Sequence, residues 1–171
     1  MDIKQELQQL PTTHCTLLYL VSNNRILLVR KTRGFGAGTL DGVGGKIESG
    51  ESSSEAAVRE AKEEIGVTPS LFTKVADLHY LELFDGKEPA HVHIDAYICE
   101  EWSGEPRATE EASDPKWYAC DAIPYETMLP DLPYWLPQAL AGDKVVGRFT
   151  LDADNQLTAH KVEIVEAFPG L

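Results

Sequence analysis

Hydrophobic residues recur along this chain with two periods, and each period predicts a different kind of element. Alternating or continuous runs of β-branched, aliphatic and aromatic residues, bounded by turn residues, are typical of strands. Such runs occur at residues 13–21, 25–31, 71–84, 90–101, close to 117–118, 145–151 and 157–165. The turns expected between neighbouring runs contain Ser22-Asn23-Asn24, Asp85-Gly86 and Asp154-Asn155. The first and last pairs of strands are therefore expected to form hairpins.

The clearest helical period lies between Ser52 and Gly66. Ser52 and Glu55 have the spacing of a capping box at a helix N-terminus, and Gly66 is a typical C-terminal stop. One arc of this helix is apolar and is expected to face a core. It contains Ala57, Val58, Ala61 and Ile65.

Three other segments have weaker helical patterns. Residues 122–128 and 133–141 are predicted to form short helices, and the second is expected to end at Gly142. The first ten residues have a weak helical period that ends at Pro11. This N-terminal piece is either a short docked helix or a loose tail.

The run at 90–101 alternates apolar and polar residues, which predicts that one face of this strand is buried. His91 and His93 belong to the polar set. Two histidines at this spacing can bind a metal together, but no third nitrogen or sulfur ligand lies at an informative spacing. We interpret the pair as the polar face of the strand.

Composition limits the class of protein and its partners. The chain has 171 residues, 43% of them hydrophobic, so it can bury the core of one domain without disulfides or a structural metal. Its formal net charge of −13 argues against nucleic acid or an anionic membrane as a partner. A small anion can still bind if a cation intervenes. A monomer is expected rather than an obligate oligomer.

The cysteines and the N-terminal residues together predict a cytoplasmic protein. Cys15, Cys99 and Cys120 are odd in number and have no paired spacing, which favours reduced thiols. The first ten residues are too polar for a signal peptide. No apolar run approaches the roughly 18 to 20 residues that a membrane helix needs.

The helix at 53–65 carries a second informative arc, which is acidic. Glu60, Glu63 and Glu64 have spacings of three and four residues, so their carboxylates crowd on one side of the helix. A divalent cation such as Mg²⁺ or Mn²⁺ would offset this repulsion, because hard cations prefer carboxylate, carbonyl and water oxygens. Arg59 adds a positive charge, and Glu51 is the acid best placed to hold it. The alternative for this run alone is a solvated helix face.

The segment before the helix is rich in glycine and locally basic. Between residues 30 and 46, one acid, Asp41, stands against four cations. The cations are Arg30, Lys31, Arg33 and Lys46. Backbone amides and cationic side chains beside a carboxylate cluster suit a metal-bound polyphosphate, which we favour over a solvated surface with ordinary glycine turns.

The complete spacing joins these features into one pattern. From Gly45 it has five free positions, Glu51, seven free positions, Arg59-Glu60, an apolar residue, Lys62, Glu63-Glu64, Ile65, Gly66 and Val67. Seven such fixed positions coincide by chance on the order of once in 10⁸ sequences, given average residue usage. The pattern resembles the signature of the Nudix hydrolases, with only Ala61 smaller than the residue many members have.

This resemblance implies an α/β fold, the Nudix α/β/α sandwich with a mixed β-sheet between helices. It places the Nudix domain at residues 13–171, after an N-terminal extension at 1–12. It also implies Mg²⁺-dependent hydrolysis, with Mn²⁺ as an alternative ion, of a nucleoside diphosphate linked to another group. The implied metal ligands are Glu60, Glu63, Glu64 and the carbonyl of Gly44, while Arg59 and Glu51 hold the loop.

One more metal ligand is implied in the loop predicted at 103–115. Nudix enzymes commonly supply another carboxylate from a loop on this side of the fold. Glu111 is the first candidate and Glu110 the second, because spacing alone does not fix the register.

The chain also resembles the MutT-like oxidised purine nucleoside triphosphate hydrolases over residues 13–165. The shared features are RGFGAG with GGK, the run YETMLPDLPYWLP at 125–137 and the closing hairpin. The resemblance implies a base pocket lined by Lys31, Phe35, Asp41, Tyr80, Leu129 and Asp131.

Three positions of that pocket depart from the animal members of this family. Asp41 replaces an asparagine, Leu129 replaces a tryptophan, and Leu132 replaces the second of two paired aspartates. A carboxylate at Asp41 or Asp131 can accept hydrogen bonds from the N1–H and N2–H₂ groups of a guanine-type base. The missing tryptophan removes a stacking surface worth roughly 1 kcal/mol, so we expect affinity or selectivity to differ.

The expected reaction is attack of water on a phosphorus of a nucleoside triphosphate, which yields the monophosphate and pyrophosphate. Glu64 lies nearest the apolar border of its helix, where desolvation would raise its pKa, so it is a candidate general base as well as a ligand. Glu63 and Glu111 are alternatives for this role. Unmodified nucleotides, dinucleoside polyphosphates and ADP-sugars are alternative substrates, and a binding module without catalysis is an alternative function.

Overall fold

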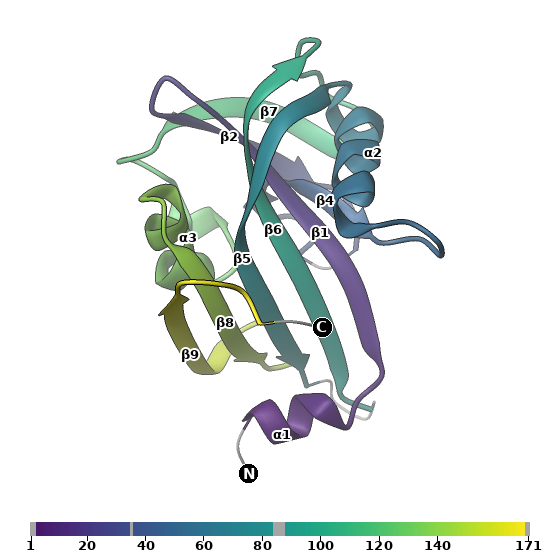
Figure 1. The fold of residues 1–171 in the computed structure, drawn as a ribbon, viewed down its shortest axis with the longest axis vertical. Helices are drawn as coiled ribbons and strands as arrows, with labels where there is room; N and C mark the ends of the chain where they lie inside the picture. Colours follow the sequence, from purple (N-terminus) through teal and green to yellow (C-terminus); the bar gives the residue numbers. More distant parts are fainter. Residues whose placement is uncertain (1–2, 35, 84–87, 170–171) are drawn as a thin grey trace.

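Figure 1 shows a computed structural model of the chain, in which residues 3–34, 36–83 and 88–169 are described. Phe35 and the turn predicted at Asp85-Gly86 lie outside the described residues. The long strands run diagonally through the molecule, with one helix packed on each side of them (Figure 1).

The described strands form one mixed sheet in the order β3-β2-β1-β6-β5-β8-β9, with β4 paired to β1 and β7 paired to β2. Their bounds are β1 Thr12–Ser22, β2 Arg25–Lys31, β3 Leu40–Asp41, β4 Val43–Lys46, β5 Thr68–Glu82, β6 Ala90–Ser103, β7 Ala112–Ala119, β8 Lys144–Leu151 and β9 Leu157–Val165. The neighbours β1 and β6 are parallel, as are β5 and β8, whereas both predicted hairpins are antiparallel. Asn23 and Asn24 have φ angles of 52° and 58°, which a tight hairpin turn requires.

Two helices cover opposite faces of the sheet and divide the core into two layers. The helix α2 (Ser53–Ile65) packs on Leu18, Leu20 and other residues of one face. The helix α3 (Leu132–Leu140) packs on Leu17, Tyr19 and other residues of the opposite face. The predicted α/β/α sandwich with a mixed sheet is therefore confirmed.

The signals that bound α2 act as the sequence predicts. The Ser52 Oγ atom accepts a hydrogen bond from the backbone N–H of Glu55 at 3.1 Å, and Gly66 closes the helix at a φ of 73°. The apolar arc is shifted slightly, because Ala56 is buried while Val58 is only half-buried.

The structure corrects the prediction that residues 103–115 form one loop. β7 begins at Ala112, which is 1% exposed and pairs with Lys31 in β2. The pairing of β7 with β2 shifts its register at Asp114 and Pro115, which form a bulge in β7. Asp114 has a φ of 49°. Pro115 lacks an N–H group for the strand pairing, and the bulge tolerates that loss.

The helix predicted at 122–128 is also wrong in its extent. Only the 3₁₀ turn η1 (Tyr125–Thr127) forms, preceded by Pro124. Proline disfavours helical backbone at the residue before it and cannot donate within a helix. At the N-terminus, α1 (Ile3–Gln8) is a short helix that contacts β5 and β8, and its Leu7 side chain is buried.

The polar set of β6 does not form a solvent-facing strand surface. His91 is 7% exposed and His93 is 9% exposed, so both faces of this strand are covered. Burial lowers the pKa of His91 to about 4, and neighbouring imidazoles add to the shift. The sequence could not show this cover, because it comes from α1 and from strands distant in the chain.

Candidate active site

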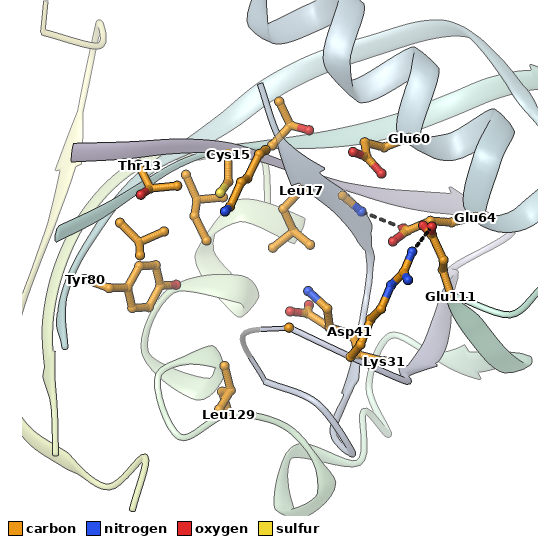
Figure 2. A pocket seen from close by; sticks show the side chains of 18 of the residues that line it. Thr13, Cys15, Leu17, Lys31, Asp41, Glu60, Glu64, Tyr80, Glu111 and Leu129 are labelled. Carbon is orange, nitrogen blue, oxygen red and sulfur yellow. Dashed lines mark hydrogen bonds and ion pairs between the residues drawn. The ribbon is translucent and has the colours of Figure 1, made fainter. Parts of the chain in front are cut away.

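A cavity of about 760 Å³ lies beside the sheet and is lined by residues from α2, α3 and the six strands β1 to β6. Figure 2 shows Glu60, Glu64 and Glu111 at one end and Tyr80 and Leu129 at the other. A volume of this size is typical of a site for a small molecule.

Three carboxylates gather at the first end. Glu60, Glu64 and Glu111 each offer an oxygen atom, and these atoms lie within 4.8 Å of one another. Glu60 and Glu64 are 8% and 7% exposed. The Glu63 side chain is about half exposed and lies 3.2 Å from the Arg59 guanidinium, outside this cluster. The structure therefore brings Glu111 to the helix acids, while Glu63 lines the cavity outside the cluster and Glu110 is exposed and does not line the cavity.

The strand β4 approaches these acids through two glycines. The Gly44 N–H donates to the Glu64 Oε2 atom at 2.8 Å. A Cβ atom at Gly45 would lie 2.5 Å from the Glu60 Oε1 atom, and one at Gly44 would lie 1.9 Å from the Thr16 carbonyl oxygen. Only glycine fits at Gly44, whereas a side chain at Gly45 would displace the Glu60 carboxylate. The ligand role of the Gly44 carbonyl stays a prediction.

Burial shapes the protonation of the helix acids. It raises the pKa of Glu64 to about 8, opposed by the Gly44 N–H and reinforced by the charge of Glu60. Burial also raises the pKa of Glu60, opposed by Arg59. Crowded, desolvated carboxylates are the donor set that hard divalent cations prefer, so the residues present fit such an ion.

Arg59 ties α2 to the loop before it. Its Nε and Nη2 atoms donate to both oxygens of Glu51 at 2.7 and 3.0 Å, and Nη2 donates to the Lys46 carbonyl at 3.0 Å. The bond from Arg59 is the main reason that the pKa of Glu51 is lowered. A planar guanidinium that binds a carboxylate through two parallel bonds fixes geometry as well as charge.

The other end of the cavity contains two buried carboxyl groups. The Asp131 Oδ2 atom accepts hydrogen bonds from the Tyr80 hydroxyl at 2.7 Å and the Trp135 Nε1–H at 2.9 Å. Its Oδ1 atom is buried and has no hydrogen-bond partner among the described residues. Asp41 accepts from the Tyr19 hydroxyl at 2.5 Å through its Oδ1 atom.

These carboxyl groups are harder to ionise than usual. Burial raises the pKa of Asp131 to about 6, partly offset by the bonds from Tyr80 and Trp135. Burial also raises the pKa of Asp41, partly offset by the charge of Lys31. A cavity end with two such groups can accept or donate hydrogen bonds in a fixed arrangement.

Four cationic side chains line the cavity, and two of them contact its acids. Lys31, Arg33, Lys46 and Arg59 all line the cavity, and Arg33 forms an ion pair with Glu111 (Figure 2 draws this contact as a dashed line). Arg30 instead donates to the Gly38 carbonyl at 2.7 Å. The basic balance predicted for this segment therefore faces the cavity through Lys31, Arg33 and Lys46.

Sequence reasoning missed Tyr19 and Trp135, which hold the two carboxyl groups in place. Trp135 follows Asp131 by four residues, a spacing that brings side chains together on a helix and could have indicated the contact. Tyr19 carries no comparable signal, because it reaches Asp41 from another strand.

A mixed sheet between helices with carboxylates on one helix defines a class of protein, the Nudix hydrolases. The sequence matches the NUDIX domain family over residues 12–139, and the chain belongs to this family of enzymes. It is 35% identical over 151 residues to the oxidized purine nucleoside triphosphate hydrolase of Danio rerio, covering 88% of this chain and 94% of that protein.

Two other relatives have similar extents. The chain is 33% identical over 153 residues to the enzyme of the same name from Mus musculus, covering 90% of this chain and 96% of that protein. The crystal structure of the MutT protein from Bacillus halodurans has a TM-score of 0.71 at 22% identity, covering 88% of this chain and 97% of that one. The structural likeness supports the fold alone.

Proposed function

We propose that this enzyme hydrolyses oxidised purine nucleoside triphosphates such as 8-oxo-dGTP to the monophosphate and pyrophosphate, with Mg²⁺ as its cofactor. The two relatives named for this activity match the chain over nearly their whole length, which supports the substrate class. The base and its oxidation state are the finer part of the proposal.

The observation that carries this proposal is the unpartnered oxygen of Asp131. A buried acceptor without a partner costs about 1 to 3 kcal/mol, so a ligand that donates a hydrogen bond there is strongly favoured. A guanine-type base offers adjacent N–H donors. Asp41 lines the same end of the cavity and gives a second point of contact, with Tyr80 and Leu129 as walls.

The opposite end is suited to phosphates. Glu60, Glu64 and Glu111 would hold the cation, with the Gly44 carbonyl and Glu63 as further predicted ligands, and Lys31 and Lys46 would bind phosphate oxygens. Bound there, Mg²⁺ would lower the pKa of water and neutralise charge on the phosphates. Arg59 and Glu51 position α2 against the loop.

The reaction forms one bond and breaks one. A water oxygen bonds to phosphorus, the bridging P–O bond breaks, and one water proton is lost to a base. Glu64 is the proposed base because it is the most desolvated of the helix acids, while Glu63 and Glu111 are the alternatives.

A substrate panel with one variant tests the proposal. We expect kcat/KM on 8-oxo-dGTP to exceed the values on dGTP, 2-hydroxy-dATP and ADP-ribose. Asp131→Asn should lower kcat/KM on 8-oxo-dGTP by about 10²-fold or more, because an amide group replaces the unpartnered acceptor with a donor.

Asp121→Asn, at an exposed position, is the matched control and should retain wild-type kinetics. Preference for ADP-ribose, or an equal loss in both variants, would contradict the proposal. Tight binding of 8-oxo-dGTP without pyrophosphate release would favour the binding module instead.

A further inference from the structure

A cluster of histidines lies outside the nucleotide cavity. Four of the five histidines of the chain form two pairs with ring nitrogen contacts of 3.1 Å, His14 with His93 and His79 with His91. Together with Asp77 they line a second cavity of about 390 Å³, which is also lined by α1, Arg148 and Pro169. No part of the proposed hydrolytic reaction uses these residues.

The pleat of the sheet separates this cluster from the nucleotide cavity. Adjacent residues of a strand point to opposite faces, so one lines the nucleotide cavity and the next lines the histidine cavity. These pairs are Cys15 and His14 in β1, Tyr80 and His79 in β5, and Val92 and His93 in β6. The two cavities therefore share their strands but no lining side chain.

Three ligand atoms converge in the histidine cavity. The Asp77 Oδ1 atom lies 3.2 Å from His79 Nε2 and 2.5 Å from His93 Nε2. Asp77, His79 and His93 each offer one ligand atom, and these atoms all lie within 4.8 Å of one another. Imidazole nitrogens and a carboxylate oxygen are ligands that bind such metals at about 2.0 to 2.2 Å.

The outer nitrogens of both imidazoles already have partners. His79 Nδ1 lies 3.1 Å from His91 Nε2, and His91 Nδ1 lies 2.9 Å from the Thr12 hydroxyl. His93 Nδ1 lies 3.1 Å from His14 Nδ1. Metal-bound imidazoles almost always donate their second N–H to such a partner, which fixes the ring orientation.

We propose that Asp77, His79 and His93 bind a divalent transition metal, for which Zn²⁺ is the best match, with water in the fourth position. Two imidazoles and one carboxylate suit zinc, whereas the oxygen-only cluster of Glu60, Glu64 and Glu111 suits magnesium. Lys74 contacts the Asp77 Oδ2 atom at 3.9 Å and so leaves Oδ1 to the metal.

A metal at this position would join β5 to β6 from the side opposite the nucleotide. Tyr80 and Val92, the neighbours of His79 and His93, line the nucleotide cavity. The metal would stabilise the strands that form that cavity without touching the substrate. Zinc binding should therefore raise the melting temperature even when the catalytic acids are replaced.

The test is a Zn²⁺ titration of the full chain with saturating Mg²⁺, in a Glu60→Gln/Glu64→Gln background that weakens the acid cluster. We expect one equivalent of bound zinc and a higher melting temperature. Adding His79→Gln and His93→Gln should weaken zinc binding by at least about 100-fold, since loss of outer partners alone costs 10- to 100-fold. His160→Gln is the matched control, because the fifth histidine stacks on Tyr134 elsewhere and should bind zinc like its parent.

Anomalous diffraction at the zinc edge from wild-type crystals gives a second measurement that does not depend on the variants folding. A zinc peak between Asp77, His79 and His93 supports the proposal. Zinc found only at the glutamate cluster, no zinc in the crystals, or unchanged affinity in the double histidine variant overturns it.

Discussion

At the scale of single residues, the site depends on close contacts that tolerate no extra atoms. Gly45 approaches Glu60 so closely that the smallest side chain would displace the carboxylate. The Asp131 side chain is held by two donors on one oxygen, while its other oxygen has no partner among the described residues. These contacts fix the positions of the carboxylate oxygens of Glu60 and Asp131.

Gly45→Ala should weaken the response to Mg²⁺ more than it weakens the fold. The added Cβ atom would lie 2.5 Å from the Glu60 Oε1 atom, so the carboxylate must move. We expect the Mg²⁺ concentration for half-maximal activity to rise about 10- to 100-fold, measured by pyrophosphate release.

Gly142→Ala gives the contrasting control. Gly142 has a φ of 97° and no atom within 4 Å of an added Cβ, so this change strains only the backbone. It should lower the free energy of unfolding by about 1 to 3 kcal/mol and leave the Mg²⁺ response unchanged. Equal Mg²⁺ responses in both variants would show that the Mg²⁺ response does not depend on the present position of the Glu60 carboxylate.

Glu64→Gln and Glu63→Gln should lower kcat by different amounts. Glu64 is buried in the carboxylate cluster, while Glu63 is about half exposed and pairs with Arg59. We expect Glu64→Gln to lower kcat by at least about 10²-fold and Glu63→Gln to lower it less, in steady-state assays with saturating Mg²⁺. A larger loss in Glu63→Gln would favour the sequence-based assignment of Glu63 as a ligand.

At the scale of elements, α2 connects the acids of the carboxylate cluster to the core. Its buried alanines and Ile65 pack against the sheet, and its acids reach the cavity from the adjacent arc. The position of the acids therefore depends on where the helix begins and ends.

Ser52→Ala should lower the free energy of unfolding by about 1 kcal/mol, because it removes the acceptor for the Glu55 N–H. Urea unfolding of the two proteins measures this difference. Ser70→Ala, the same change at an exposed strand position, should lie within about 0.5 kcal/mol of wild type. If Ser52→Ala lowers the free energy of unfolding no more than Ser70→Ala does, the Ser52 cap does not stabilise α2.

At the scale of the whole molecule, charge and burial act together. The chain has a formal net charge of −13, yet the nucleotide cavity gathers Lys31, Lys46 and Arg59 beside its acids. Within the described residues, no helix is long and apolar enough to cross a bilayer. The proposed polyphosphate substrate could approach this acidic protein because the cavity supplies local cations and carboxylates that fit a metal.

The pH dependence of stability should reveal the buried Asp131 carboxyl. Its folded pKa of about 6 lies above the ordinary value of 3.8, so folding favours the protonated form. The stabilisation is complete below about pH 3.8 and is lost as the pH rises through about 6. Relative to Asp131→Asn, wild type should lose about 1 to 3 kcal/mol of unfolding free energy between pH 4 and 7.

Urea unfolding at several pH values in EDTA measures this difference. Asp121→Asn, at an exposed position, should give a difference from wild type that does not change with pH. A pH-independent difference for Asp131→Asn would mean that its carboxyl titrates alike in the folded and unfolded chains.

The sequence by itself determined the elements and the chemistry that depend on neighbouring residues. The caps of α2, its acidic arc, both hairpins and the Nudix spacing arise within short segments, where backbone geometry fixes which side chains meet. Two predicted segments differ where a proline lies: a bulge in β7 accommodates Pro115, and the helix predicted at 122–128 is only one turn that follows Pro124.

Only the tertiary structure decided which distant groups share a site. It placed Glu111 beside Glu60 and Glu64, and it joined Tyr80 to Asp131 across 51 positions of the chain. It also buried His93 against His14, 79 positions away, where the alternation of β6 had predicted a polar face. Side-chain period shows which residues of a strand face the same way, but what covers that face depends on how the strands and helices pack.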